Sequence, residues 1–125
     1  RPTAPLAVLL GLALVPIGAT WFLADNLPPV LAEGQSFLAL LSDPLGEGWD
    51  LFGTIDMTID YTLASADWVQ WVQLVALLGG HLGAVVLVHD GALARVGRRR
   101  GMRVTWTVAA AAAASFVAAA LLVLG

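Results

Sequence analysis

The sequence predicts an all-α integral membrane protein with three transmembrane helices and a short extracytoplasmic segment that carries an interfacial helix. Of its 125 residues, 59% are hydrophobic and only 12% are charged, and the mean hydropathy is +0.85. Soluble domains have roughly a quarter of their residues charged. Three apolar runs approach the roughly 20 residues that a helix needs to cross a bilayer. The charges between these runs are sorted by sign, which is typical of a protein with a fixed membrane orientation.

The sorted charges predict that orientation. Between the first and second runs there is no Lys or Arg, and the acidic residues there are Asp25, Glu33, Asp43, Glu47, Asp50, Asp56, Asp60 and Asp67. The connector between the second and third runs carries Arg95, Arg98, Arg99, Arg100 and Arg103. Because short Arg-rich connectors stay in the cytoplasm, we expect residues 89–103 and the N-terminus on the cytoplasmic side of the plasma membrane. Residues 25–67 are then extracytoplasmic, in a single multi-pass membrane unit over 1–125.

The first predicted span covers residues 6–24, which carry no charge. Pro16 is expected to kink it, and Trp21 and Phe22 are expected to anchor it at the interface. A signal peptide is the alternative, but the apolar run is longer than the roughly 7–15 residues of a signal-peptide core. Since the chain begins at Arg1 and not at Met, the expectation is that a leader or a larger N-terminal part has been removed and that the chain is a fragment.

The acidic segment is expected to begin where Pro28 and Pro29 end the first span. Residues 30–41 are predicted to form a short helix in the membrane interface. Its apolar face would consist of Phe37, Leu38, Leu40 and Leu41. Asp43-Pro44 and the glycines that follow predict turns.

The second predicted span, residues 68–88, is the most polar of the three. Gln70 and Gln73 share a helix face with His81, and together they form a polar stripe. Buried polar groups without partners cost several kcal/mol each in lipid, so this stripe should face protein or water. The same span carries the small residues Gly79, Gly80, Gly83 and Ala84, whose spacing favours close helix packing. The third span, residues 104–124, has an alanine-rich block at 109–114.

His81 is the strongest candidate for a cofactor-binding residue because it lies near the middle of the second span. An imidazole is a suitable ligand for haem or copper. The candidate metal ligands are His81, His89 and Asp90. Eight residues of helix separate the two histidines by about 12 Å, so the remaining ligands would come from another chain. The alternatives are a histidine hydrogen-bonded to a neighbouring helix, a proton or substrate role for His81, and an interfacial ion pair for Asp90.

Several classes of function find no support in the sequence. There is no cysteine for a disulfide or a thiolate metal site, and no motif of a phosphate-binding loop, a nucleophile elbow or a zinc protease. The acidic residues lack the spacing of an EF-hand, although they suit a basic extracytoplasmic protein as a partner. No basic patch with interleaved aromatics points to nucleic acid.

Three stretches carry a family resemblance: Ser42 to Gly46, Gly48 to Thr54, and Gly80-His81 through His89-Asp90. Over roughly residues 17–96 the chain resembles the C-terminal portion of actinobacterial multi-pass membrane proteins labelled fenitrothion hydrolase-like. The resemblance implies a longer membrane protein, of which this chain is a shortened relative or a fragment. Those proteins tend to place histidines in the first span, where this chain has Phe22 and Asp25. This departure favours a subunit role over independent catalysis.

We therefore expect a small helical accessory subunit of a larger bacterial membrane complex, in respiratory or metal-dependent redox machinery. Its partners would be other membrane subunits and the lipid bilayer. The first alternative is a metal-dependent or hydrolase-like membrane enzyme with His81, His89 and Asp90 in its site. The second is a transport component whose polar stripe lines a path for protons or metal ions.

Overall fold

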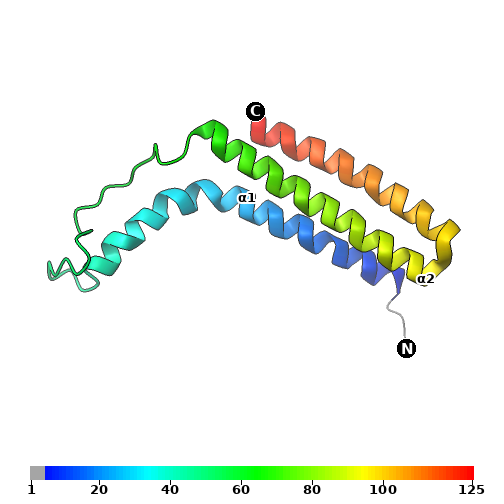
Figure 1. Ribbon diagram of the computed structural model, residues 1–125, viewed down its shortest axis with the longest axis horizontal. Coiled ribbons are helices and arrows are strands. Elements are labelled where there is room, and N and C mark those ends of the chain that lie inside the picture. The colour runs from blue at the N-terminus through cyan, green and yellow to red at the C-terminus, as the bar shows by residue number, and fades with distance from the viewer. Residues whose placement is uncertain (1–4) are drawn as a thin grey trace. The chain divides into compact units, whose positions relative to one another are not determined.

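The computed structural model describes residues 5–125, and within that range it contains two helices and no strand (Figure 1). Helix α1 spans Leu6–Ser42 and helix α2 spans Ala66–Leu124. The prediction of three transmembrane helices is therefore wrong. Both helices are long and apolar enough to cross a membrane, by length and composition.

The first reason for the difference lies at the proline pair. Helix α1 continues through Pro28 and Pro29 to Ser42, so residues 30–41 belong to α1 and not to a separate interfacial helix. Pro28 has no N–H to donate to the carbonyl four residues earlier. That carbonyl, of Ala24, instead accepts a hydrogen bond from Nε2 of Gln73 at 2.8 Å. A side chain from α2 thus satisfies the carbonyl that the proline leaves without its helical donor.

The second reason lies in the predicted connector, residues 89–103, which is helical except at Gly97 (φ 75°, ψ 169°). A positive φ is accessible to glycine without the steric cost that a Cβ brings. Three pairs of hydrogen-bonded residues are centred on or next to this position: Gln70 with Val123, His81 with Ser115, and His89 with Thr105. Helix α2 therefore folds back on itself at Gly97, and its two arms contact each other along their length.

The chain divides into two compact units. The first, here the helical unit, consists of the chain up to Ala24 together with Gln70–Gly125. The second, here the acidic unit, is Asp25–Val69.

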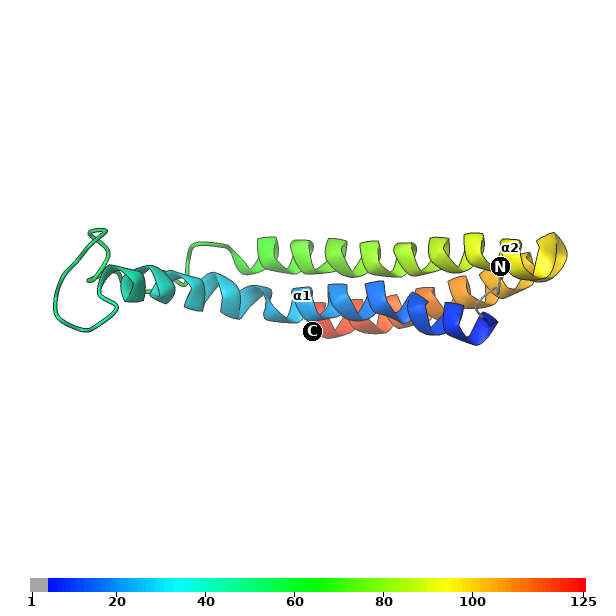
Figure 2. The ribbon, with the colours of Figure 1, turned by 90° about the horizontal axis from the view of Figure 1, so that it is seen from below.

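In the helical unit, the N-terminal part of α1 and the two arms of α2 lie side by side (Figures 1 and 2). Their contacts are made mainly by small side chains. One cluster of buried residues consists of Leu9, Ala13, Ala84, Val88 and Ala92, and the other of Ala24, Leu77 and Ala119. Small residues at these positions allow helix backbones to approach closely, as is common in membrane helix packing.

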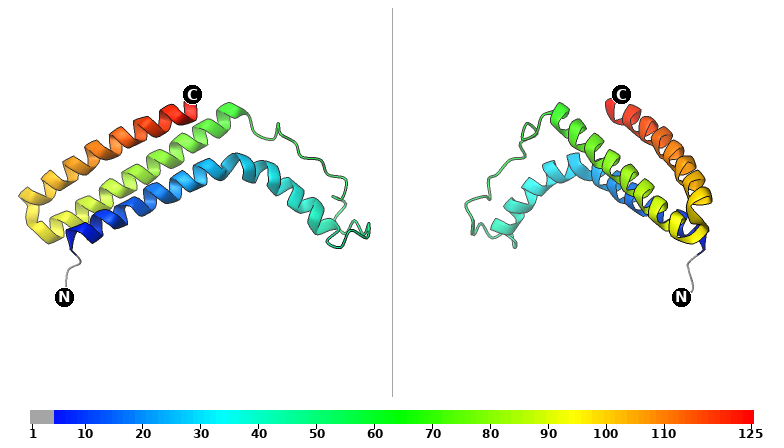
Figure 3. Two further views of the ribbon diagram at one scale, coloured as in Figure 1. Left: turned by 180° about the vertical axis from the view of Figure 1, so that it is seen from behind. Right: turned by 45° about the vertical axis from the view of Figure 1, so that its right-hand side comes forward.

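In the acidic unit, the segment after Ser42 runs back beside the end of α1 (Figure 3). Oγ1 of Thr54 donates to the carbonyl of Leu38 at 2.8 Å. Further along, Gln35 binds the backbone of Asp60 twice: its Nε2 donates to the carbonyl at 3.1 Å, and its Oε1 accepts from the N–H at 2.9 Å. These side-chain bonds fix the returning segment, which has no regular secondary structure between Ser42 and Ala66.

Candidate functional site

The polar stripe of α2 is directed at backbone carbonyls. Nε2 of Gln73 binds the carbonyl of Ala24, and Nε2 of Gln70 donates to the carbonyl of Val123 at 3.3 Å. Val123 lies in the last turn of α2, where carbonyls lack helical donors. Each glutamine therefore donates to a backbone carbonyl that has no N–H donor in the helix to which the carbonyl belongs.

His81 is 4% exposed, and both of its ring nitrogens have partners within the helical unit. Nδ1 lies 2.7 Å from the carbonyl of Leu77, and Nε2 lies 2.9 Å from Oγ of Ser115. Since a carbonyl only accepts, Nδ1 carries the proton in the contact with Leu77. The Ser115 hydroxyl lies beside Nε2 and also donates to the carbonyl of Ala112 at 3.0 Å. The ring also meets Phe116 edge-on, with centroids 5.7 Å apart. Ligation of a metal or haem at Nε2 would require the Ser115 bond to break.

The structure does not bring the three predicted metal ligands into one cluster. Nδ1 of His89 lies 3.3 Å from Oγ1 of Thr105, on the other arm of α2, while Asp90 is exposed. Among residues 5–125 there is no group of three His, Cys, Asp or Glu side chains that could hold a metal ion. A metal at His81 would therefore need its remaining ligands from another chain, as the sequence predicts.

The predicted small-residue face separates into a closely packed pair, Gly80 and Ala84, an open position, Gly79, and Gly83, at which an added Cβ would lie 3.8 Å from Pro16. A Cβ on Gly80 would collide with the side chain of Thr20 and would lie 2.7 Å from the carbonyl oxygen of Pro16. Ala84, one turn further, is 1% exposed in the same interface. A Cβ on Gly79 would meet nothing within 4 Å. Gly80 is therefore a residue at which α2 approaches the backbone of α1 too closely for any larger side chain.

In the acidic unit, Ser42 is a fully buried hydrogen-bonding centre that the sequence analysis did not identify. Its hydroxyl donates to Oδ1 of Asp50 at 2.9 Å and accepts from the N–H groups of Phe52 at 3.1 Å and Thr54 at 3.4 Å. Its carbonyl accepts from the N–H of Leu51 at 2.9 Å. These bonds join the two halves of the Ser42–Thr54 stretch into one folded loop at the end of α1.

Two carboxylates of this unit are held in the charged form by local hydrogen bonds. The N–H of Ile55, followed by the Ser42 hydroxyl, lowers the pKa of Asp50 below its usual 3.8. The hydroxyl and then the N–H of Thr62, at 2.6 and 2.8 Å from Oδ1, lower the pKa of Asp60 in the same way. Both side chains are therefore anionic at neutral pH, with no Lys or Arg in the acidic unit.

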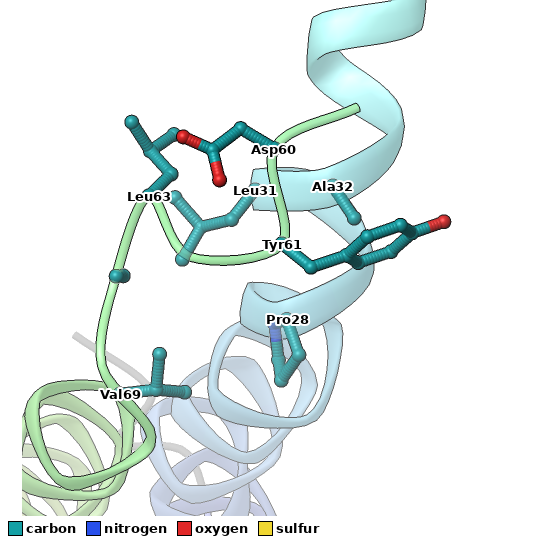
Figure 4. A pocket seen from close by; sticks show the side chains of 8 residues that line it. Pro28, Leu31, Ala32, Asp60, Tyr61, Leu63 and Val69 are labelled. Atoms are coloured by element: carbon teal, nitrogen blue, oxygen red, sulfur yellow. The ribbon is translucent and has the colours of Figure 1, made fainter. Parts of the chain in front are cut away.

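Asp60 also lines a cavity of about 150 Å³ within the acidic unit. Figure 4 shows Asp60 near Leu31 and Leu63, with Pro28 and Val69 at the other end of the group and the Tyr61 hydroxyl pointing away from them. A larger hollow of about 380 Å³, reaching to Trp68, shares Leu31, Leu63 and Ala64 with it. The two therefore adjoin, and their lining is mainly apolar, with Asp60, Tyr61 and Ser65 as the polar residues.

The residues that organise the acidic unit gave little signal in the sequence. Ser42 precedes an Asp-Pro pair, a pattern typical of helix ends and turns, so its position could have been noticed. Gln35 acts on a residue 25 positions away, and no local pattern encodes that pairing.

No family model, curated protein or solved structure matches this chain in the comparisons.

Proposed function

We propose that this chain is a non-catalytic helical subunit of a larger membrane assembly. The observation that carries the proposal is the use of the polar groups in the helical unit. Gln70, Gln73 and His81 each bind a carbonyl of the chain itself. Polar groups that hold a bundle together stabilise its fold, which is the role that a structural subunit requires.

The apolar surface supports a role in assembly. In the most apolar 18-residue window of each helix, only 11% of the residues are buried. Large side chains such as Leu14, Val15 and Leu122 are more than 60% exposed. Lipid can cover such a surface, and so can the helices of neighbouring subunits, which pack best against small residues of the kind that fill this unit.

The orientation of the assembly follows from the charges. One end of the helical unit contains the fold-back at Gly97, beside the exposed side chains of Arg98, Arg99 and Arg100. At the opposite end, marked by the Gln73–Ala24 bond, the chain continues into the acidic unit. The positive-inside rule assigns the arginine end to the cytoplasm and the acidic unit to the outside.

The subunit proposal is tested by native mass spectrometry on material extracted with its lipids, after the chain is tagged at its own locus. We expect a species of constant stoichiometry in which the 13.0 kDa chain is accompanied by other membrane polypeptides. The chain alone, or only copies of itself, would refute the subunit proposal. Gly79→Leu is the matched variant. Because Gly79 is exposed and has no close neighbours within the chain, the added side chain changes only the outer surface of α2.

A further inference from the structure

We propose that the cavity beside Asp60 is a docking site for a lysine side chain of a basic extracytoplasmic protein segment, with an adjacent apolar residue of that segment in the hollow that reaches Trp68. This inference deepens the proposed function, because it says which kind of partner the acidic unit binds. It rests on the proposed function in one respect: the proposed orientation places that partner outside the cytoplasm.

The size of the cavity favours a single side chain. Its volume of about 150 Å³ suits one side chain rather than a drug-sized ligand, and the adjoining hollow of about 380 Å³ has room for a neighbouring residue of the same segment. Pro28, Leu31 and Leu63 provide apolar walls, which suit the methylene stem of a lysine. Lysine commonly packs its stem on apolar surface while its ammonium group reaches a polar partner.

The negative charge of Asp60, a residue that lines the cavity, favours a cationic side chain. Within the described residues, both Thr62 bonds to Asp60 go to Oδ1, so Oδ2 is left for a further donor. The acidic unit has no Lys or Arg of its own that could neutralise this carboxylate. A hydrogen bond between an ammonium and a carboxylate is about twice as strong as one between neutral groups.

The backbone around Asp60 is fixed before any partner arrives. Gln35 binds both the N–H and the carbonyl of Asp60, and Thr62 closes a turn on its side chain. A site that is ordered in advance loses less entropy on binding. The adjoining hollow, lined by Leu63 and Trp68 among others, gives the same segment a second, apolar contact.

The test measures binding of a short acetylated peptide with one Lys-Leu pair to the full chain in dodecyl maltoside, an uncharged detergent, by NMR chemical-shift titration. The matched peptide carries norleucine in place of lysine. We expect the lysine peptide to bind more tightly than the norleucine peptide by about tenfold, and Asp60→Asn to remove that difference. Asparagine keeps an oxygen that can accept the Thr62 bonds, so the turn should persist.

Asp56→Asn is the control, because Asp56 is exposed in the same unit and lies outside the cavity. It removes the same charge and should weaken binding less than about twofold. Ala64→Leu, which fills space between the two hollows without changing any charge, should abolish binding. Equal losses in the two Asp variants would reduce the effect to net charge and overturn the proposal. So would equal affinity for both peptides, no binding at all, or preferential displacement by the headgroup glycerophosphoethanolamine, which would assign the cavity to lipid.

Discussion

Replacing Gly80 by alanine is expected to lower the free energy of unfolding by about 1–3 kcal/mol, the range for inserting atoms into a packed interface. The added methyl group would collide with the side chain of Thr20, and it would lie 2.7 Å from the backbone oxygen of Pro16. A backbone atom cannot rotate away as a flexible side chain can. Helix α1 must therefore shift from α2, which disturbs the buried contacts of Ala13 and Ala84 in the same interface.

The adjacent Gly79→Ala substitution is the control for this measurement. It makes the same change in helix propensity, but nothing lies within 4 Å of the new methyl group. In a titration with SDS followed by circular dichroism, the free energy of unfolding of Gly79→Ala should equal that of the parent chain or exceed it by up to about 1 kcal/mol. Equal stability of the two variants would show that α1 and α2 do not approach at Gly80.

His81→Ala is expected to cost about 2 kcal/mol or more. The substitution removes a ring that is 4% exposed, together with its bonds to Leu77 and Ser115 and its contact with Phe116. Ser115→Ala keeps the ring and removes only the hydroxyl, which contacts Nε2 of His81 and donates to the carbonyl of Ala112 within the same helix. About 0.5–1 kcal/mol is expected for it, as for other hydrogen bonds between membrane helices.

The same variants separate a structural histidine from a cofactor ligand. We expect the visible absorption spectrum and the metal content of the purified protein to be unchanged by His81→Ala, while its unfolding midpoint falls. Haem absorbance or copper that disappears with His81, but not with Ser115, would restore the ligand hypothesis and contradict the structural role.

The sequence predicted the type of secondary structure better than the positions at which the helices begin and end. The apolar runs correctly indicated helices long enough to cross a membrane, because hydropathy depends on local composition alone. The predicted number of helices was wrong because the sequence rules for helix ends failed at two places. Proline normally ends a helix, yet α1 continues past Pro28 because Gln73, from another helix, binds the freed carbonyl of Ala24. In α2, the residues that were expected to form a connector between two spans are helical except at Gly97.

The candidate site shows the same limit. His81, Gln70 and Gln73 were identified from their spacing as one polar stripe, and the structure gives each of them a partner within the chain. Those partners are 34 to 53 residues away, so no local pattern could name them. The cavity beside Asp60 likewise depends on the pairing of Gln35 with a residue 25 positions later. An acidic composition indicated the sign of a partner, but not the place where it would bind.

The central claim is that the acidic unit and the arginine end of the helical unit face opposite sides of the membrane. The chain has no cysteine, so Glu47→Cys and Arg99→Cys each introduce one exposed thiol. A maleimide that cannot cross membranes should label Glu47→Cys in intact cells and should label Arg99→Cys only after permeabilisation. Labelling of both thiols in intact cells, or the reverse pattern, would contradict the claim.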